Sequence, residues 1–232
     1  MNNLILIRHG QSLWNKERRF TGWADIDLTD EVGKSEAKQA GLLIKELNIN
    51  FDTFFSSKLV RAIRTLNIIK GILNKPNDNI NKAWELNERH YGNLTGLNKD
   101  ETIKKYGNKQ VLIWRRSFDI APPPMSPDHP YINKINSKIL SESLKDTFDR
   151  VIPFYEKNIE PLIALNKNIL ISFHGNSIRA LLKKIFNISN KKIVELEIPT
   201  GNPLLVNLDE NLKVKKYRYL DAKRSKKILF NI

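Results

Sequence analysis

The sequence predicts an α/β fold, a three-layer sandwich in which a mostly parallel central sheet has helices on both faces. Three short apolar runs, at 4–7, 51–55 and 168–173, support this prediction. Apolar runs of this length are typical of strands buried on both faces, as in the middle of a parallel sheet. Apolar residues at helical spacing follow each run further along the chain, which is the strand–helix order of such folds.

Length and composition indicate one domain spanning 1–232. A chain of 232 residues with 41% hydrophobic residues can bury a substantial core. The absence of cysteine excludes a disulfide framework, a thiol nucleophile and a thiolate metal site. The first apolar run is too short for a signal peptide or a membrane span. We therefore expect a cytoplasmic protein with no membrane partner.

The chain is basic, with 39 Lys and Arg against 25 Asp and Glu and a formal charge of +14. Such a balance is compatible with nucleic-acid binding. Lysines, however, are scattered along the whole length, mostly singly or in pairs. Solvated lysines together with one anion pocket are therefore the favoured interpretation, with no nucleic-acid partner, and a nucleic-acid-binding protein remains the distant alternative.

Arg8, His9 and Gly10 come directly after the first apolar run, at the predicted carboxyl end of a strand. Open α/β sheets bind ligands at that edge. A neutral imidazole can act as a nucleophile, and the guanidinium beside it suits phosphate. The simplest chemical interpretation is a histidine that becomes phosphorylated. For these three residues alone, a packed and hydrogen-bonded Arg-His pair is equally compatible.

A second histidine follows the run 168–173, as His174-Gly175-Asn176, and Ser177 is expected to open the next helix. Ser57 is expected to cap a further helix that carries Arg61 in its first turn. A cation is mildly unfavourable at a helix N-terminus, and a bound anion would offset this. Both segments therefore repeat the arrangement of polar residues at the end of a strand.

The remaining segments divide into loops, a lid and a tail. Residues 75–81 are polar and contain a proline, which predicts a loop. The prolines between 121 and 136 exclude helix there and favour a lid-like irregular segment at about 117–140. Residues 204–208 and 213–220 predict a hairpin at one edge of the sheet. A flexible, basic tail is expected at about 221–232.

Seven blocks of the chain, in order, resemble the 2,3-bisphosphoglycerate-dependent phosphoglycerate mutases of the histidine phosphatase superfamily. They are RHGQSLWN followed by FTGW (8–23), SSKLVRAIRT (56–65), LNERHYGNLTGLNK (86–99), WRRSFDIAPPPM (114–125), SESLKDTFDRV (141–151), HGNSIRAL (174–181) and PTGNPL (199–204). The resemblance covers nearly the whole chain. Ser12 favours the mutase over a dedicated bisphosphoglycerate mutase, which tends to carry glycine there. Residues 84–128 favour it over a plain phosphohydrolase.

The resemblance implies the site and its chemistry. The phosphorylated His9 would transfer its phosphoryl group to the 2-hydroxyl of 3-phosphoglycerate, with Glu88 as general base and then acid. His174, Arg8 and Arg61 would stabilise charge on the transferring group. The substrate-binding residues implied are Arg8, His9, Gly10, Gln11, Ser12, Leu13, Trp14, Asn15, Thr21, Gly22, Arg61, Glu88, Arg89, His90, Tyr91, Lys99, Arg115, Arg116, Gly175 and Asn176.

The implied primer is 2,3-bisphosphoglycerate, and no metal is expected because the histidines at 9, 90, 129 and 174 show no ligand spacing. The implied partners are small-molecule phosphoglycerates. A homo-oligomer, most simply a dimer, is also expected.

Overall fold

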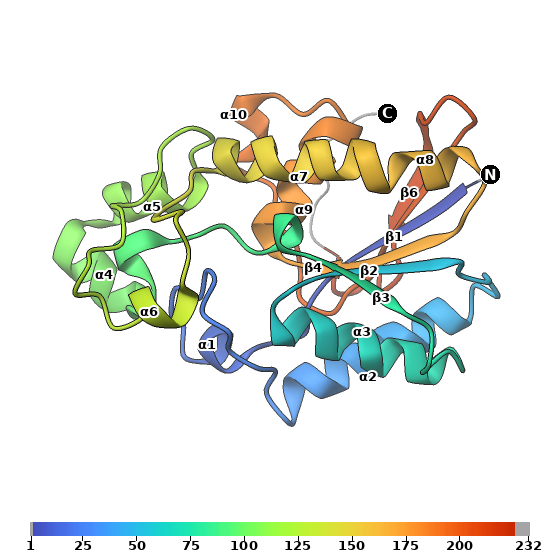
Figure 1. Cartoon of the computed structure of the whole chain (residues 1–232), viewed down its shortest axis with the longest axis horizontal. Helices are drawn as coiled ribbons and strands as arrows, with labels where there is room; N and C mark the ends of the chain where they lie inside the picture. Colours follow the sequence, from blue (N-terminus) through green and yellow to red (C-terminus); the bar gives the residue numbers. More distant parts are fainter. Residues whose placement is uncertain (1, 226–232) are drawn as a thin grey trace.

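One mixed sheet runs through the middle of the protein in the computed structural model, which describes residues 2–225 (Figure 1). The strand order is β3-β2-β4-β1-β5-β6, where β1 to β4 are parallel and β5 and β6 are antiparallel to their neighbours. The strands are β1 (Asn2–Arg8), β2 (Thr53–Ser57), β3 (Ile80–Ala83), β4 (Ile169–Phe173), β5 (Leu204–Leu208) and β6 (Val214–Tyr219). The predicted mostly parallel sheet and its edge hairpin are confirmed.

Helices cover both faces of this sheet, which confirms the three-layer prediction (Figure 1). Below it in that view lie α2 (Val32–Lys45) and α3 (Val60–Ile72). Above it lie α7 (Leu144–Asn158), α8 (Glu160–Ala164), α9 (Gly175–Ile185) and α10 (Asn190–Ile193).

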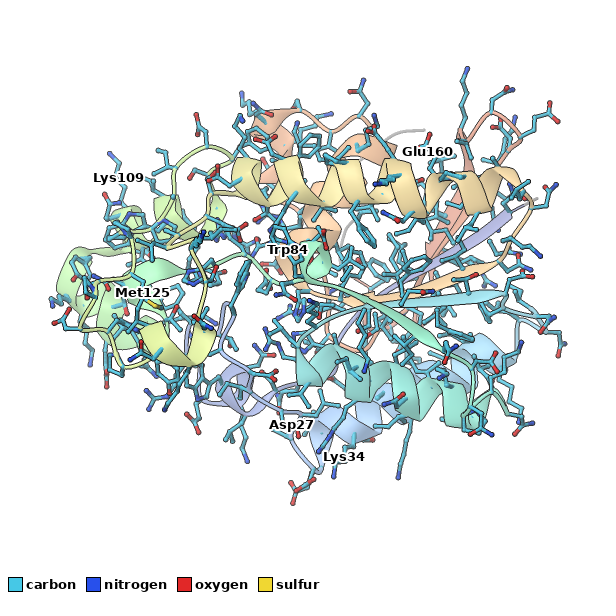
Figure 2. All side chains as sticks on the ribbon, in the orientation of Figure 1. Asp27, Lys34, Trp84, Lys109, Met125 and Glu160 are labelled. Carbon is cyan, nitrogen blue, oxygen red and sulfur yellow. The ribbon has the colours of Figure 1, made fainter. Side chains whose placement is uncertain are left out.

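The alternation of side chains along β1 divides the core into two layers. Leu4 and Leu6 pack in the larger apolar cluster with residues of α7 and α9, whereas Ile5 and Ile7 pack with residues of α2 and α3. Successive side chains of a strand point to opposite faces, so a continuous apolar run serves both layers. Side chains fill the space between the sheet and the helices on each side (Figure 2).

Several short helices gather beyond the carboxyl ends of the parallel strands, at the left of Figure 1. They are α1 (Leu13–Lys16), α4 (Lys99–Tyr106), α5 (Asn108–Arg116) and α6 (Ile132–Ile135). Two 3-10 helices, η1 (Trp84–Leu86) and η2 (Gly92–Leu94), lie in the segment that leads to them. Phe20, Leu94 and Val111 form a small separate core there.

The strand β3 begins inside the loop predicted at 75–81: residues 75–79 are turn and irregular structure, as predicted, but 80 and 81 belong to the strand. Ile80 pairs with Phe54 and Ala83 with Ser57, so the strand forms by parallel pairing at the edge of the sheet. Its two central residues are polar and exposed. An edge strand with one solvated side carries no continuous apolar run, and the sequence signal was therefore too weak.

Two helix starts also differ from the prediction. The N-cap of α3 is Leu59 rather than Ser57, whose hydroxyl instead accepts the Leu59 N–H at 3.2 Å. The helix α9 begins at Gly175, and Ser177 reaches back to the His174 N–H at 3.3 Å. In both cases the polar side chain satisfies a backbone group at the strand–helix junction rather than marking the first helical residue.

The segment predicted as a lid, 117–140, is mostly irregular, but the exclusion of helix at 121–136 was wrong for one turn. Helix α6 forms at Ile132–Ile135, after the last proline of the segment, where backbone N–H groups are again free to bond. Met125, labelled in Figure 2, is 2% exposed and its N–H donates to Leu140 O at 2.8 Å. Whether the segment acts as a lid stays a prediction.

The predicted flexible tail, 221–232, lies partly outside the described residues, because 226–232 are not described. At its start, Asp221 exchanges two hydrogen bonds with the side chain of Asn202, at 2.9 and 3.1 Å. Among the helices of residues 2–225, none is both long and apolar enough to cross a membrane.

The backbone of the turn after β1 packs so closely against the start of helix α2 that no side chain fits between them. A Cβ on Gly33 would lie 2.1 Å from Gln11 O, and one on Gly10 would lie 2.3 Å from Gly33 O. We expect Gly33→Ala to lower the free energy of unfolding in urea by about 1–3 kcal/mol, because backbone atoms must move apart. Gly71→Ala, in open space on α3, is the control and should raise it by about 0.5–1 kcal/mol. Equal effects of the two substitutions would contradict this account.

Candidate active site

The two histidines predicted at strand ends meet because their strands are neighbours. In the parallel pair β1 and β4, Arg8 is opposite Phe173, so His9 and His174 both follow at the same edge. The His9 N–H donates to Phe173 O at 3.0 Å. The ring centroids lie 5.0 Å apart with an interplanar angle of 60°. Both rings are buried, at 2% and 0% exposed.

The hydrogen bonds of His9 define which ring nitrogen is free to react. Its Nδ1 lies 2.7 Å from Gly10 O, and a carbonyl oxygen only accepts, so Nδ1 carries the proton. Its Nε2 accepts from Arg61 Nε at 3.3 Å and is unprotonated. Burial, then Arg61 and Arg8, lower the pKa of His9 well below its ordinary value. His9 is therefore a neutral imidazole with its Nε2 lone pair on the side of a cation.

Arg61 is held rigidly by the segment that follows α1. Its Nη1 donates to Ala24 O at 2.9 Å and its Nη2 to Gly22 O at 2.8 Å. Burial lowers its pKa to about 10, so it remains charged at neutral pH. The predicted position, in the first turn of the helix after β2, is confirmed by the start of α3 at Val60.

His174 is oriented by a residue to which the sequence had assigned only a capping role. Ser57, at the end of β2, places its Oγ 2.8 Å from His174 Nε2. Burial, then Arg61 and His9, lower the pKa of His174 well below its ordinary value. Within the described residues the buried Nδ1 of His174 has no hydrogen-bond partner. The second histidine is thus neutral in the free protein.

Glu88 reaches the same edge from the loop between η1 and η2. Its Oε1 accepts the backbone N–H of Arg89 at 2.8 Å and that of Asn176 at 3.1 Å. Its carbonyl oxygen accepts from the Trp23 indole and from Arg150 Nη2. Backbone and side chain are both fixed, so this carboxylate has a defined position beside the start of α9.

Two connected cavities lie at this edge. The smaller, about 50 Å³, is lined by residues that include His9, Thr21, Gly22 and Arg61. The larger, about 340 Å³, is lined by residues that include Arg115, Arg116, Gly175 and Asn176. Both are lined by Arg8, Glu88, Tyr91 and Lys99. The structure therefore brings thirteen of the predicted site residues, Asn15 among them, to these two cavities.

Positive charge is concentrated in these cavities. Burial lowers the pKa of Lys99, which nearby Arg115 and Arg8 lower further. Burial, with Arg116, also lowers the pKa of Arg115. Among residues 2–225, neither side chain, nor Arg8, forms an ion pair with a carboxylate. Crowded cations that lack anionic partners would be stabilised by a ligand with several negative charges.

Some predicted residues lie around the site rather than in its cavities. Gly10 donates its N–H to Thr65 Oγ1 at 3.1 Å, and Ser12 forms a capping box with Asn15, which lines the smaller cavity. Gln11 and Leu13 line a separate surface cavity of about 370 Å³.

Trp14, Arg89 and His90 are three further predicted residues that line neither of the connected cavities. Trp14 lines another surface cavity, of about 720 Å³. Arg89 is fully buried, with its guanidinium carbon 4.8 Å from the ring centroid of Tyr91. His90 accepts the Gly92 N–H at 3.0 Å, and burial, with Arg150, lowers its pKa to about 4. These buried groups support Tyr91 and the loop that carries Glu88 without lining the two cavities.

The sequence interpretation missed Arg179 and Thr200, which line the larger cavity. Arg179 Nη1 donates to Asn176 Oδ1 at 2.8 Å, and burial, then Arg89 and Arg116, lower its pKa to about 9. The signal was present for Arg179, because it lies one helical turn after Asn176 and so on the same face of α9. Thr200 follows an apolar segment and turns toward the cavity only through tertiary contacts.

Comparisons with known proteins agree with this geometry. The profile of the histidine phosphatase superfamily (branch 1) matches residues 4–217. A 2,3-bisphosphoglycerate-dependent phosphoglycerate mutase of Pelagibacter ubique (strain HTCC1062) is 51% identical over 239 residues, 99% of each chain. The enzyme of that name from Caulobacter sp. (strain K31) is 50% identical over 228 residues, 96% of each chain.

A mycobacterial glucosyl-3-phosphoglycerate phosphatase, solved with VO3, has a similar structure. The TM-score is 0.72 at 20% identity, over 94% of this chain and 97% of that chain. This likeness bears on the fold. The profile match and the relatives of about 50% sequence identity show that the protein belongs to the histidine phosphatase superfamily.

The phenol of Tyr91 gives the site a pH dependence. Burial raises its pKa, but Arg89 and Lys99 outweigh burial and lower the pKa to about 8. Above that pH the phenolate adds negative charge to the cavity and opposes an anionic ligand. We expect the KM for a phosphorylated acid to rise roughly tenfold per pH unit well above pH 8, the slope of a single ionisation. Tyr91→Phe should abolish the rise, and an unchanged pH profile in that variant would assign the ionisation to another group.

Proposed function

We propose that this protein interconverts 3-phosphoglycerate and 2-phosphoglycerate through a phosphohistidine at His9, primed by 2,3-bisphosphoglycerate. The observation that carries the proposal is the neutral His9, whose unprotonated Nε2 accepts from Arg61 and lines a cavity together with Arg8 and Lys99. Relatives of about 50% identity over nearly the whole chain bear the corresponding mutase name, which supports the proposal.

In this mechanism His9 Nε2 attacks phosphorus, the bond from phosphorus to the departing ester oxygen breaks, and Nε2 holds the phosphoryl group while Nδ1–H remains bonded to Gly10 O. The Arg61 Nε–H, now beside the phosphoryl group, stabilises its oxygens together with Arg8 and His174. Glu88, held by two backbone N–H groups, takes the proton of the substrate 2-hydroxyl when that oxygen attacks the phosphohistidine. In the second transfer His9 Nε2 takes up the 3-phosphoryl group, the bond between phosphorus and the 3-oxygen breaks, and Glu88 gives its proton to that oxygen, which leaves 2-phosphoglycerate.

The residues of the cavities fit 2,3-bisphosphoglycerate, which when bound supplies the phosphoryl group that charges His9. Three anionic groups need several separated cations, and Arg8 and Lys99 line both cavities while Arg115 and Arg116 line the larger. Planar guanidinium groups suit carboxylate and phosphate oxygens through paired hydrogen bonds. Thr21 and the backbone N–H groups of the first turn of α9 add neutral donors.

No metal is part of the proposal. Among the described residues, no three His, Asp or Glu side chains cluster so that they could hold a metal ion. Arg8, Arg61 and Lys99 line the smaller cavity, where their charges would neutralise phosphate oxygens.

The alternatives are a histidine-type phosphohydrolase, in which water discharges His9, and a bisphosphoglycerate mutase. Residues 84–128 favour the mutase, since they supply Glu88, Tyr91, Lys99 and the Arg115-Arg116 pair to the larger cavity. These side chains would hold a second anionic group away from the phosphorus, as a phosphoglycerate requires. A nucleic-acid-binding role is not favoured, because the site's cations converge on a small cavity.

We also propose that the protein is cytoplasmic and that it forms a homodimer. Sedimentation would measure the oligomeric state.

The experiment that tests the function is a coupled assay of 3- to 2-phosphoglycerate conversion in excess EDTA, with and without 2,3-bisphosphoglycerate. We expect conversion that depends on the primer and survives the chelator. Release of inorganic phosphate without 2-phosphoglycerate would favour the phosphohydrolase. Loss of conversion in EDTA, restored by manganese, would reject the metal-independent mechanism.

The phosphorylated residue can be identified directly. Incubation with 2,3-bisphosphoglycerate should give an acid-labile, base-stable phosphoprotein in the wild type, measured by intact-protein mass spectrometry. His9→Ala should not be labelled, because it lacks the unprotonated Nε2 that accepts from Arg61. His129→Ala, on the lid segment and outside both cavities, is the matched control and should label fully. Full labelling of His9→Ala would disprove the assignment.

Glu88→Gln keeps the shape and hydrogen-bond acceptor of the carboxylate but cannot take up a proton. General acid–base catalysis contributes roughly 10²- to 10⁴-fold, so we expect kcat to fall by about that factor with little change in KM. Phosphorylation of His9 should slow as well, since the departing oxygen needs the proton. Steady-state and single-turnover kinetics measure both steps. A kcat within a few-fold of the wild type would transfer the role to another group.

A further inference from the structure

One carboxylate outside the catalytic site joins three segments that border it. Glu36, on α2, accepts the Gln11 N–H with Oε2 at 2.7 Å. Its Oε1 accepts from the Thr200 hydroxyl at 2.8 Å and from Arg224 Nη2 at 2.6 Å. Gln11 follows His9 and Gly10, Thr200 belongs to the 198–202 loop, and Arg224 follows β6. The side chain of Glu36 is 13% exposed.

The 198–202 loop is bonded to Arg8 as well as to Glu36. Arg8 Nη1 donates to Ile198 O at 2.8 Å, and the Gly201 N–H donates to Arg8 O at 2.9 Å. A Cβ on Gly201 would lie 2.5 Å from Glu36 Cβ, so the loop rests directly on α2. The residues Ile198, Pro199 and Thr200 form one wall of the larger cavity. A displacement of the loop would therefore move a wall of the site and a cation in it.

Arg224 completes this cluster from the C-terminal side of the chain. Its Nη2 also donates to Thr200 O at 2.8 Å, so one guanidinium nitrogen bridges Glu36 and the loop. The segment is placed by Asp221, whose Oδ1 accepts the Arg224 N–H at 3.2 Å, and by the paired bonds between Asp221 and Asn202. Charge-assisted hydrogen bonds of this kind are stronger than neutral ones and directional.

We propose that Glu36 and Arg224 are positioning residues that hold the 198–202 loop, and with it Arg8, in the geometry that binds the anionic substrate. The segment after β6 thereby sets substrate affinity without touching the substrate. An isolated ion pair as exposed as this one would contribute little. Here the carboxylate also satisfies a backbone N–H and a hydroxyl, and the guanidinium a carbonyl, so the loss of either side chain releases the loop.

The expected change in KM rests on the proposed function, whereas the expected change in amide hydrogen exchange does not. Arg224→Met removes the guanidinium and keeps an unbranched side chain. We expect the KM for 3-phosphoglycerate to rise roughly fivefold to tenfold, with kcat within about twofold, because His9 and Glu88 are untouched. Amide hydrogen exchange at Gly201 and Gln11 should accelerate at least about tenfold, since their bonds open with the loop.

Arg218→Met is the matched control, because Arg218 is exposed on β6 and, among the described residues, forms no ion pair. It should leave both KM and exchange at the wild-type values. Arg224→Lys keeps a cation and should recover most of the affinity, and thermal unfolding of each variant separates positioning from loss of fold.

A double-mutant cycle decides whether Arg224 acts through Glu36. Glu36→Gln alone should raise both the KM and the amide exchange rates at Gly201 and Gln11. Adding Arg224→Met to that variant should then change the KM by less than about twofold. Effects of the two substitutions that multiply, or an Arg224→Met variant that behaves like Arg218→Met, would overturn the proposal. If the wild type converts no phosphoglycerate, the proposed function fails instead, and the exchange rates at Gly201 and Gln11 still decide whether the loop is held in this way.

Discussion

The pairing of β1 with β4 is the constraint on which the rest of the site depends. Parallel pairing opposes Arg8 to Phe173 and so brings His9 and His174 to the same edge. The first turn of α3 can then deliver Arg61 to His9, because β2 is the next neighbour of β4. A shift of one residue in either pairing would move a catalytic side chain to the opposite face of the sheet.

The second important feature is the buried positive charge of Arg61, Lys99 and Arg179, none of which forms an ion pair with a carboxylate within residues 2–225. Burial and neighbouring cations lower the pKa of Arg61, Lys99 and Arg179 together. Such crowding opposes folding, and the two apolar layers against the sheet must offset it. The same crowding favours an anion that enters the cavities, so the cost in stability and the affinity for substrate have one physical origin.

The protein also contains a buried ion pair, between Arg150 and Glu142, which holds the loop that carries Glu88. Arg150 Nε lies 2.6 Å from Glu142 Oε1, and both side chains are almost fully buried. Arg150 Nη1 donates to the carbonyl oxygens of Glu85 and Asn87, and Nη2 donates to that of Glu88 and to Glu142 Oε2. Glu142 Oε2 accepts the His90 N–H at 2.8 Å. A buried ion pair is weak evidence for stability, but these bonds fix the backbone that carries Glu88, the proposed general base.

The sequence by itself determined the strands β1, β2, β4 and β5, the edge hairpin and the positions of His9 and His174 at strand ends, because apolar runs followed by these residues are local patterns. It could not determine β3, whose polar residues become a strand only through pairing with β2. Nor could it show that Ser57 orients His174, or that Glu36 joins loops more than a hundred residues apart. Such contacts join segments that are distant along the chain. Only the packing of the folded sheet and helices decides which of them meet.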